Sequence, residues 1–530
     1  MPKLKLPPQQ SLPPQPKTPS KSPKIAIIGG GIAGMALALS LQHNEIPNVT
    51  LYERDTHFDA RKPGYGLTLT YNDKGPLAAL KILEDCAIMD VPSRSHYIFD
   101  HLGRVRGYFG SALDPAKSVN GQRGNLRVPR QQLRGHLLDK LSVATVQWNK
   151  KLASITSNTD TNSNTSTITF SDGTSVSDVT LIIGADGINS TTRTFALPPS
   201  SPPPLNDLGV FVILGISTFS HDLILNKGFY TIDSSSQMRL FTMPFSNTET
   251  MWQLSFVVGE GGAISKFKNL DSAGLKQLAL SLCEKWHHPV PSIIAASSDE
   301  LVWATSLFDI EPMIELHAKN NTSPNPNPPS AQIILIGDAQ HAMSPFKGQG
   351  ANQSITDATQ LSQLITKHTK ISSSNGNLST MLRTFEREMN QRTRVKVLAS
   401  REAIANVHTT KMFSDERKFA DLANSDLRAF DEDLDGKCQN FLGIGIVPPP
   451  PPIPFPLSLQ DQLLANEFLG AVEDSNMPLI RQHSISHPQL CRKAFSQRIN
   501  KDKIQTSDFA RDWLVTEGLQ INIRNFVAHP

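Results

Sequence analysis

The strongest constraint on the fold comes from a glycine-rich turn that joins an apolar run to an alanine-rich stretch near the N-terminus. Residues 25–28 are all apolar, which predicts a short buried strand, and residues 32–41 have the composition of a helix. Residues 49–53, which read VTLYE, predict a second strand. Strand, helix and strand within about thirty residues form one β-α-β unit, so we expect an α/β fold.

The turn has the pattern G-x-G-x-x-G, with Gly29, Gly31 and Gly34 at its glycine positions. The first glycine permits a tight turn, the second lets a pyrophosphate approach the backbone, and the third lets the helix pack closely on the strand. The pyrophosphate would lie at the helix N-terminus, where free N–H groups and the helix dipole favour an anion. Glu53 ends the second strand and can accept hydrogen bonds from ribose hydroxyls, which disfavours NADP at this site.

A second glycine-rich segment, residues 337–352, follows the apolar run 332–336 and reads GDAQHAMSPFKGQGAN. Its Asp338 stands at the end of a predicted strand, where the carboxylate can accept hydrogen bonds from ligand hydroxyls. Gly348 and Gly350 let a ring approach the backbone, and the helix expected next would direct its positive end at that ring. The alternative is an ordinary glycine-rich loop that caps a helix.

A third segment, residues 181–193, reads LIIGADGINSTTR. Taken alone, the pair Asp186-Gly187 is more often a turn than a binding site. The apolar strand before this pair, and Arg193 three residues after Ser190, favour a binding site over that alternative.

Together the three segments resemble those of the class A flavoprotein monooxygenases, which have the para-hydroxybenzoate hydroxylase fold. The resemblance covers about residues 24–406, and residues 125–155 look most like the subgroup of tetracycline-inactivating and aromatic-polyketide monooxygenases. It implies a glutathione-reductase-type, Rossmann-like FAD domain with an inserted antiparallel sheet and C-terminal helices. The cofactor residues that it implies are Gly29, Gly31, Gly34, Glu53, Arg61, Arg130, Asp186, Gly187, Asp338, Pro345, Gly348, Gly350, Ala351 and Asn352.

The two arginines of that set rest on smaller matches. Arg130, in the run RQQL, resembles a family arginine that reaches the ribityl or phosphate part of FAD, whereas Arg127 is better explained as a solvated charge. Arg61 precedes the run GYGL, residues 64–67, which resembles the segment that passes the flavin. Either arginine could instead be a surface charge.

The resemblance also implies a reaction. Non-covalent FAD would be reduced by NADPH or NADH as a transient co-substrate, react with O₂ and give a C4a-hydroperoxyflavin that hydroxylates a small aromatic or polycyclic substrate. The flavin carries the chemistry, so no side chain is expected to be catalytic. The substrate would lie between the flavin and the antiparallel sheet, where Arg239 and Gln253 are candidate lining residues. Strand alternation could equally place either side chain in solvent.

The predicted organisation follows from these motifs, because the glycine turn and Asp338 must meet at one FAD. We therefore expect a discontinuous flavin domain in two parts, with a sheet domain inserted between them. Short apolar runs between residues 209 and 258 predict the antiparallel strands, and residues 125–141 are expected to form a helix. The predicted boundaries are a disordered proline-rich tail (1–23), the first FAD part (24–200), the sheet domain (201–330), the second FAD part with a long helix (331–428), and a proline-rich linker with a helical extension (429–530).

Composition excludes several other classes. A net charge of +3, from 51 basic and 48 acidic residues, argues against nucleic-acid binding driven by bulk charge. The four cysteines form no C-x-x-C pair, and the acidic loop at 431–436 lacks the final glutamate of a calcium site, so no metal is expected. No apolar run could span a membrane, and no secretory signal is evident. We expect a cytoplasmic protein, either a monomer or a homodimer.

Other functions on the same motifs remain open from the sequence. They are a halogenase or prenyl-chain reductase of the same fold, and a non-catalytic flavin-binding protein. A nicotinamide-only dehydrogenase would leave the segment at 337–352 unexplained.

Overall fold

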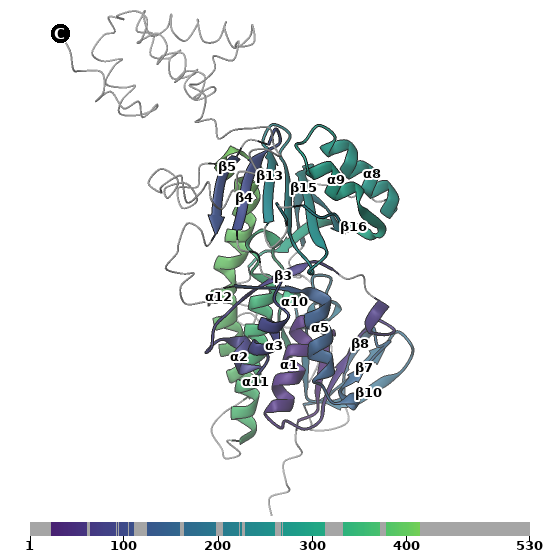
Figure 1. Ribbon diagram of the computed structural model, residues 1–530. Coiled ribbons are helices and arrows are strands. Elements are labelled where there is room, and N and C mark those ends of the chain that lie inside the picture. Colours follow the sequence, from purple (N-terminus) through teal and green to yellow (C-terminus); the bar gives the residue numbers. More distant parts are fainter. Residues whose placement is uncertain are drawn as a thin grey trace, which may run out of the picture. The chain divides into compact units, whose positions relative to one another are not determined.

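The computed structural model describes residues 23–413 except 61–63, 92, 94, 104, 111–124, 159–163, 198–204, 222, 225–227, 260–266, 268, 313–331 and 371–377. Figure 1 shows the arrangement of its elements. The predictions for the N-terminal tail, Arg61, the acidic loop and the C-terminal extension lie outside the described residues. In the described part of the chain, no helix combines the length and apolarity needed to cross a bilayer.

A five-stranded parallel sheet forms the base of the molecule, in the order β17-β11-β1-β2-β7. The glycine turn follows β1, which lies at the centre and is buried along its whole length because all its residues are apolar. The bounds of the strands are β1 Ile25–Ile28, β2 Val49–Tyr52, β7 Val146–Gln147, β11 Leu181–Gly184 and β17 Gln332–Leu335.

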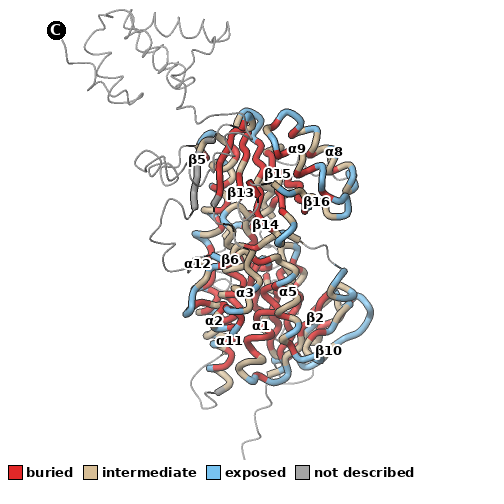
Figure 2. The backbone as a smooth tube through the Cα atoms, viewed as in Figure 1, coloured by how far each residue is buried: buried red, intermediate tan, exposed pale blue. Residues whose placement is uncertain are grey.

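Helices cover one face of this sheet and a small antiparallel sheet covers the other. Helix α1 (Ile32–His43) is apolar on all sides and packs against α11 (Gly350–Lys370), so it is almost wholly buried (Figure 2). On the other face, Ala26 and Ile28 pack against Ile168 and Phe170 of the sheet β10-β9-β8. Its strands are β8 Leu152–Ser157, β9 Ser166–Phe170 and β10 Ser175–Val179.

The predicted antiparallel sheet is present and is larger than the sequence indicated. It has seven strands in the order β16-β12-β15-β14-β13-β4-β5, and β4 pairs in parallel with β13 while the other pairs are antiparallel. Its strands are β4 Ser95–Asp100, β5 Val105–Gly110, β12 Leu205–Ser217, β13 Gly228–Asp233, β14 Met238–Pro244, β15 Thr250–Val257 and β16 Ser297–Ile310. Thus β4 and β5 reach it from residues that precede 200 in the sequence.

One face of the seven-stranded sheet is covered by α8 (Ser272–Cys283) and α9 (Val290–Ala295), which bury Trp252 completely. The indole Nε1 of Trp252 donates to Ser297 Oγ at 2.7 Å, so this core leaves its one polar ring atom satisfied. The long helix α12 (Leu378–Val407) contacts α11, β17 and β16, and so runs beside both large sheets (Figure 1).

The predicted helix at 125–141 is wrong in its first part. Residues Asn125–Pro129 form strand β6, which pairs with β3 (Gly66–Thr70), and only Arg130–Asp139 is helical, as α5. The reason is visible in the sequence: Leu126 and Val128 alternate with polar residues and are both buried, which is the period of a strand. Pro129 then ends the strand and precedes the helix.

The prediction that Arg127 is a solvated charge is also wrong. This residue lies on β6, and its backbone N donates to Asp90 Oδ1 at 2.7 Å. Its side-chain Nε and Nη1 are buried, and burial lowers its pKa. The error follows from the wrong secondary structure. At the start of an exposed helix the Arg127 side chain would be in solvent, whereas on strand β6 it points toward the interior.

The remaining described elements are short. They are the helices α2 Pro76–Ala79, α3 Leu83–Ile88, α6 Thr191–Ala196 and α10 Asp338–His341, and the 3₁₀ turns η1 Phe58–Ala60, η3 Val143–Thr145, η4 Pro345–Lys347 and η5 Thr410–Phe413.

Candidate functional site

A cavity of about 850 Å³ lies between the carboxyl ends of the parallel strands and one face of the seven-stranded sheet. All three sequence motifs reach it, although they are up to about three hundred residues apart. The predicted site residues that line it are Gly29, Gly31, Glu53, Arg130, Asp186, Gly187, Gln253, Asp338, Pro345, Gly348, Gly350 and Ala351. Gly34, Asn352 and Arg239 do not line it, and Arg61 lies outside the described residues.

The glycines of the first turn have different surroundings. A Cβ on Gly34 would lie 2.0 Å from the carbonyl oxygen of Gly29, and one on Gly29 would lie 2.4 Å from that of Ala185. A Cβ on Gly31 would meet nothing within 4 Å. Gly29 and Gly34 are therefore required by the fold itself, whereas Gly31 borders open space at the start of α1, where no side chain caps the helix. An uncapped helix N-terminus with a bare backbone is suited to a pyrophosphate.

Glu53 is buried and already has backbone partners. Its Oε2 accepts from Gly30 N at 2.6 Å and its Oε1 accepts from Asp55 N at 3.0 Å. The carboxylate therefore fixes the glycine turn as well as facing the cavity. Its contact with a ribose stays a prediction.

Arg134 supports the same turn and was not among the residues predicted from the sequence. It is fully buried, donates from Nε to Gly30 O at 2.8 Å and from Nη1 to Phe58 O at 3.1 Å, and its guanidinium lies over the Phe58 ring. The available signal was its spacing: Arg134 follows Arg130 by four residues on α5 and so shares a helix face with it.

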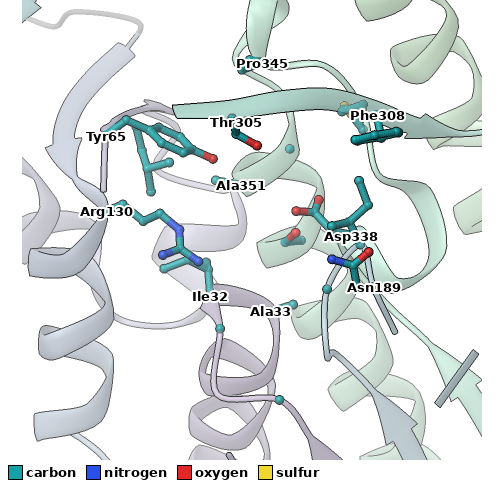
Figure 3. A pocket seen from close by; sticks show the side chains of 18 of the residues that line it. Ile32, Ala33, Tyr65, Arg130, Asn189, Thr305, Phe308, Asp338, Pro345 and Ala351 are labelled. Atoms are coloured by element: carbon teal, nitrogen blue, oxygen red, sulfur yellow. The ribbon is translucent and has the colours of Figure 1, made fainter. Parts of the chain in front are cut away.

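Arg130 and Tyr65 enter the cavity from one side, opposite Asp338 and Asn189 (Figure 3). The backbone N of Arg130 donates to Tyr65 O at 3.0 Å, which joins α5 to the residue before β3. Loss of solvent raises the pKa of the Tyr65 phenol, and the charge on Asp338 raises it further, while Arg130 acts in the opposite direction. The Tyr65 phenol is thus neutral in the cavity, and this residue was not among those predicted from the sequence.

Asp338 lies deep in the molecule, yet its side chain is accessible because it faces the cavity. No described group donates a hydrogen bond to its carboxylate. Loss of solvent raises the pKa of Asp338, and the charges of His341 and Arg130 counter that shift. A carboxylate that lacks donors and faces a cavity is suited to ligand hydroxyls, as the sequence suggested for this position.

A buried ionic network holds the loop that carries Asp338. Asp357, which is fully buried on α11, accepts from Gly337 N at 2.9 Å, from His341 Nε2 at 2.6 Å and from Arg392 Nη2 at 2.6 Å. Burial alone would lower the pKa of His341, but the Asp357 carboxylate raises it, and the same contacts lower the pKa of Asp357. Gly337 has φ +60°, a backbone conformation that residues other than glycine rarely adopt. The hydrogen bond from Gly337 N to Asp357 holds the loop in this conformation.

The segment around Asp186 is tied to the same loop. Asp186 accepts from Ser190 Oγ and from Thr192 N, and Ser190 caps α6 by accepting from Arg193 N at 2.9 Å. Arg193 Nη1 then donates to Ala339 O at 2.9 Å. Gly187 has φ +82° and open space where a Cβ would be, so the backbone is bare at the cavity wall.

The start of α11 completes this half of the cavity. Gly348 has φ +60°, and a Cβ there would lie 3.5 Å from Thr68 Cβ on β3. Asn352 donates from Nδ2 to Thr68 O at 2.8 Å and accepts from Thr70 N at 2.9 Å. Its side chain therefore joins α11 to β3, and a cofactor contact of Asn352 stays a prediction.

The other half of the cavity is formed by side chains of the seven-stranded sheet. Register places Phe241, Gln253, Leu214 and Trp303 opposite one another on neighbouring strands, so they project from one face. Further lining residues from this sheet are Val212, Met243, Met251, Thr305, Ser306, Leu307 and Phe308. This half has no ionisable side chain among its described lining residues.

Arg239 is buried beside this half of the cavity and does not line it. Its guanidinium carbon lies 4.9, 5.4 and 5.1 Å from the ring centroids of Tyr230, Phe241 and Phe346. Its Nε and Nη1 have no hydrogen-bond partner among the described residues, and burial lowers its pKa. The sequence left two positions open for the Arg239 side chain, in solvent or at the cavity wall. The side chain lies in neither, because it is buried among aromatic rings beside the cavity.

Comparison with known proteins agrees with this geometry. A protein-family model described as "FAD binding domain" matches residues 327–394. A probable FAD-dependent monooxygenase of Arthroderma benhamiae is 25% identical over 441 residues, which are 73% of this chain and 93% of that protein. The 6-methylsalicylate 1-monooxygenase of Aspergillus terreus is 26% identical over 396 residues, 72% and 82% of the two chains. Klebsiella pneumoniae HpxO, solved with FAD and uric acid, superposes with a TM-score of 0.60 at 22% identity, covering 80% of this chain and 98% of that one.

Proposed function

We propose that this chain, which has the fold of the class A flavoprotein monooxygenases, is an FAD-dependent enzyme that uses NADPH or NADH and O₂ to hydroxylate a small aromatic or polycyclic compound. The observation that carries the proposal is the cavity shared by the two sheets. At one end three segments from distant parts of the sequence present bare backbone and polar side chains, and at the other end strands present an apolar face. Such a cavity places a dinucleotide beside an apolar ligand.

The residues of the first half fit FAD in both charge and shape. Gly31 and the N-terminus of α1 would hold the pyrophosphate, and Glu53 the adenosine ribose. Asp338, which has no described donor, and Arg130 opposite it would hold the ribityl chain. The bare backbone at Gly348 and Gly350 would lie along the ring, with the N-terminus of α11 directed at it. When bound and reduced, FAD supplies an oxygen atom activated from O₂.

The protein contributes placement and exclusion of water. The apolar strand face would hold an aromatic ring against the flavin end of the cavity and keep water from the reacting atoms. Gln253 and Thr305 are the polar side chains there that could orient a substrate hydroxyl or carbonyl. Arg239 would act from behind Phe241 by its positive charge, which favours an electron-rich or ionised phenol in the cavity.

The named relatives support the same activity. Two are FAD-dependent or aromatic-acid monooxygenases, and each aligns with more than two thirds of this chain. No specific observation favours a halogenase, a reductase or a non-catalytic protein. The cytoplasmic location and the monomeric or homodimeric state stay predictions from the sequence.

The test is the rate of NADPH and NADH oxidation by FAD-loaded protein with a panel of phenols, naphthols and polycyclic aromatics. We expect at least one compound to stimulate the rate and to gain one oxygen atom from O₂, as measured by mass spectrometry with labelled O₂. A purified protein that binds no FAD would refute the proposal. So would an FAD-loaded protein that no compound in the panel stimulates, or one whose product gains chlorine only when chloride is present.

A further inference from the structure

Two methionine side chains meet at one point of strand β3, inside the cavity. Met251 Sδ accepts a hydrogen bond from Gly66 N at 3.2 Å. A Cβ on Gly66 would lie 2.6 Å from Met243 Cε and 3.3 Å from Met243 Sδ, so the second thioether lies against the same residue. Both side chains line the cavity and are otherwise buried.

This point is close to the loop that would carry the flavin ring. Thr68 lies two residues beyond Gly66, on the same face of β3, and a Cβ on Gly348 would lie 3.5 Å from Thr68 Cβ. Two residues of a strand span roughly 6–7 Å. The thioethers and the Gly348 loop therefore border one small region of the cavity beside β3.

Thioethers are nucleophiles toward activated oxygen, and buried methionine is converted to its sulfoxide by the same kind of oxidant that hydroxylates an electron-rich ring. A substrate in the cavity would separate the flavin from both sulfurs. Without substrate, the described groups of the sheet half that can accept oxygen most readily are Met243 and Met251. Phe241 and Trp303 also line this half, but a thioether is softer and more easily oxidised than either ring.

We propose that Met243 and Met251 are sites of self-oxygenation, at which the enzyme modifies itself when it activates O₂ with no substrate bound. This inference rests on the proposed function. A sulfur lone pair forms the new S–O bond while the O–O bond breaks, and the second oxygen leaves as water. Reduced flavin, O₂ and thioether thus give oxidised flavin, sulfoxide and water, and NADPH or NADH with one proton restores the reduced flavin.

Oxidation of Met251 would change the polarity and shape of the cavity wall. A sulfoxide at Met251 is polar and larger than the thioether, and its sulfur would no longer accept the Gly66 N–H as before. The Gly66 segment would shift, so self-oxygenation would inactivate the enzyme in proportion to substrate-free turnover.

The experiment uses the full-length, FAD-loaded protein. Its flavin is reduced by light and EDTA without oxygen, and the protein is then mixed with isotopically labelled O₂ in the presence of catalase and superoxide dismutase. Peptide mass spectrometry measures labelled sulfoxide at each methionine. Met35, which is fully buried in α1, and Met89, which is partly exposed on the surface, serve as internal controls.

We expect labelled sulfoxide at Met243 or Met251 to exceed that at Met89 by about tenfold, and Met35 to remain unmodified. An aromatic ligand that stimulates NADPH or NADH oxidation should suppress the label. Met243→Leu conserves volume and keeps the hydrogen bond from Gly66 N to Met251 Sδ, so this variant should bind FAD normally and lose activity more slowly during substrate-free turnover.

Other results would overturn the proposal. Equal labelling of Met89 and Met251 would mean that free peroxide is the oxidant. Reoxidation of bound flavin with no sulfoxide at Met243 or Met251 would reject self-oxygenation at these two residues, even if the third methionine of the cavity wall, Met343, were modified, and would leave the proposed function intact. A protein that holds no FAD would instead reject the proposed function.

Discussion

The two halves of the cavity are built in different ways. The cofactor half consists of loops that follow parallel strands. Glycines leave its backbone bare at several points, and Asp338 and Arg130 face each other across it. The sheet half consists of side chains that alternate along four extended strands. The shape of the cofactor half therefore depends on positions that only glycine can occupy. The shape of the sheet half depends on its side chains, because an extended strand backbone tolerates many residue types.

This difference predicts different responses to substitution. A change in the cofactor half should alter FAD binding or the fold, because its residues are fixed by backbone contacts and buried charges. A change in the sheet half should alter the substrate and leave FAD in place.

The largest effect is expected from Gly34→Ala, with Gly31→Ala as its matched control. A methyl group at Gly34 would overlap the carbonyl of Gly29, so α1 would have to move from β1 and the protein should fail to fold stably. A methyl group at Gly31 meets only open space, so the melting temperature should be unchanged while FAD affinity falls. Thermal melting and FAD content measure the two. Equal destabilisation by both changes would contradict this account of the turn.

Asp357→Asn should have the next largest effect, with a loss of about 3–5 kcal/mol in the free energy of unfolding. It removes the buried carboxylate that faces His341 and Arg392, so Arg392 loses its charge partner and burial drives His341 to its neutral form. The control is Asp299→Asn, which neutralises an exposed carboxylate paired with Lys276 and should cost under about 1 kcal/mol. Denaturant unfolding measures the free energy of unfolding of both variants. Similar losses would mean that the buried Asp357 network stabilises the fold no more than a surface ion pair does.

The same network predicts a pH dependence. The pKa of His341 is raised from 6.5 by Asp357, so its stabilising contribution is complete below pH 6.5 and is lost as the pH rises through the raised value. The pKa of Asp357 is lowered from 3.8, so its contribution is lost only as the pH falls below that value. The melting temperature should thus decline on the alkaline side, and His341→Gln should remove that decline. An unchanged alkaline decline in His341→Gln would assign it to other groups.

The smallest of these effects is expected in the sheet half. Gln253→Leu should raise KM for a stimulating phenol by about tenfold, because a hydrogen bond to the substrate is lost, while FAD affinity stays the same. Gln132→Leu, at an exposed position of α5, is the control and should change neither. Initial rates measure KM, and flavin fluorescence measures FAD affinity. A loss of FAD affinity in Gln253→Leu would contradict the proposal that the sheet half binds only the substrate.

The cofactor half was largely predictable from the sequence, because its backbone conformations and close contacts require glycine at particular positions. A φ of +60° or +108°, or a contact of 2.0 Å at a missing Cβ, demands glycine, and the spacing of Gly29, Gly31 and Gly34 along the chain indicates such a turn. What the motifs could not show was the support behind them. The positions of Arg134 and Asp357 can be read from the sequence, but their hydrogen bonds to Gly30 O and Gly337 N depend on the tertiary fold.

The sheet half was predictable only as a sheet. Its strands from 209 to 258 were expected, but β16 was missed, and so were β4 and β5, which join it through a parallel pairing with β13. Which side chains face the cavity depends on register between strands that are distant in sequence. Gln253 lines the cavity, and its contact with a substrate stays a prediction. Arg239 does not line the cavity, because three aromatic rings enclose it beside the wall.

We propose that one cavity holds FAD at one end and an aromatic substrate at the other. The visible absorption spectrum of FAD-loaded protein, recorded while a stimulating aromatic compound is added, tests it most directly when wild type is compared with Gln253→Trp, which fills the sheet half. The account predicts one FAD per chain in both proteins, with a ligand-induced spectral change in wild type alone. Loss of FAD from Gln253→Trp, or an undiminished spectral change in that variant, would contradict it.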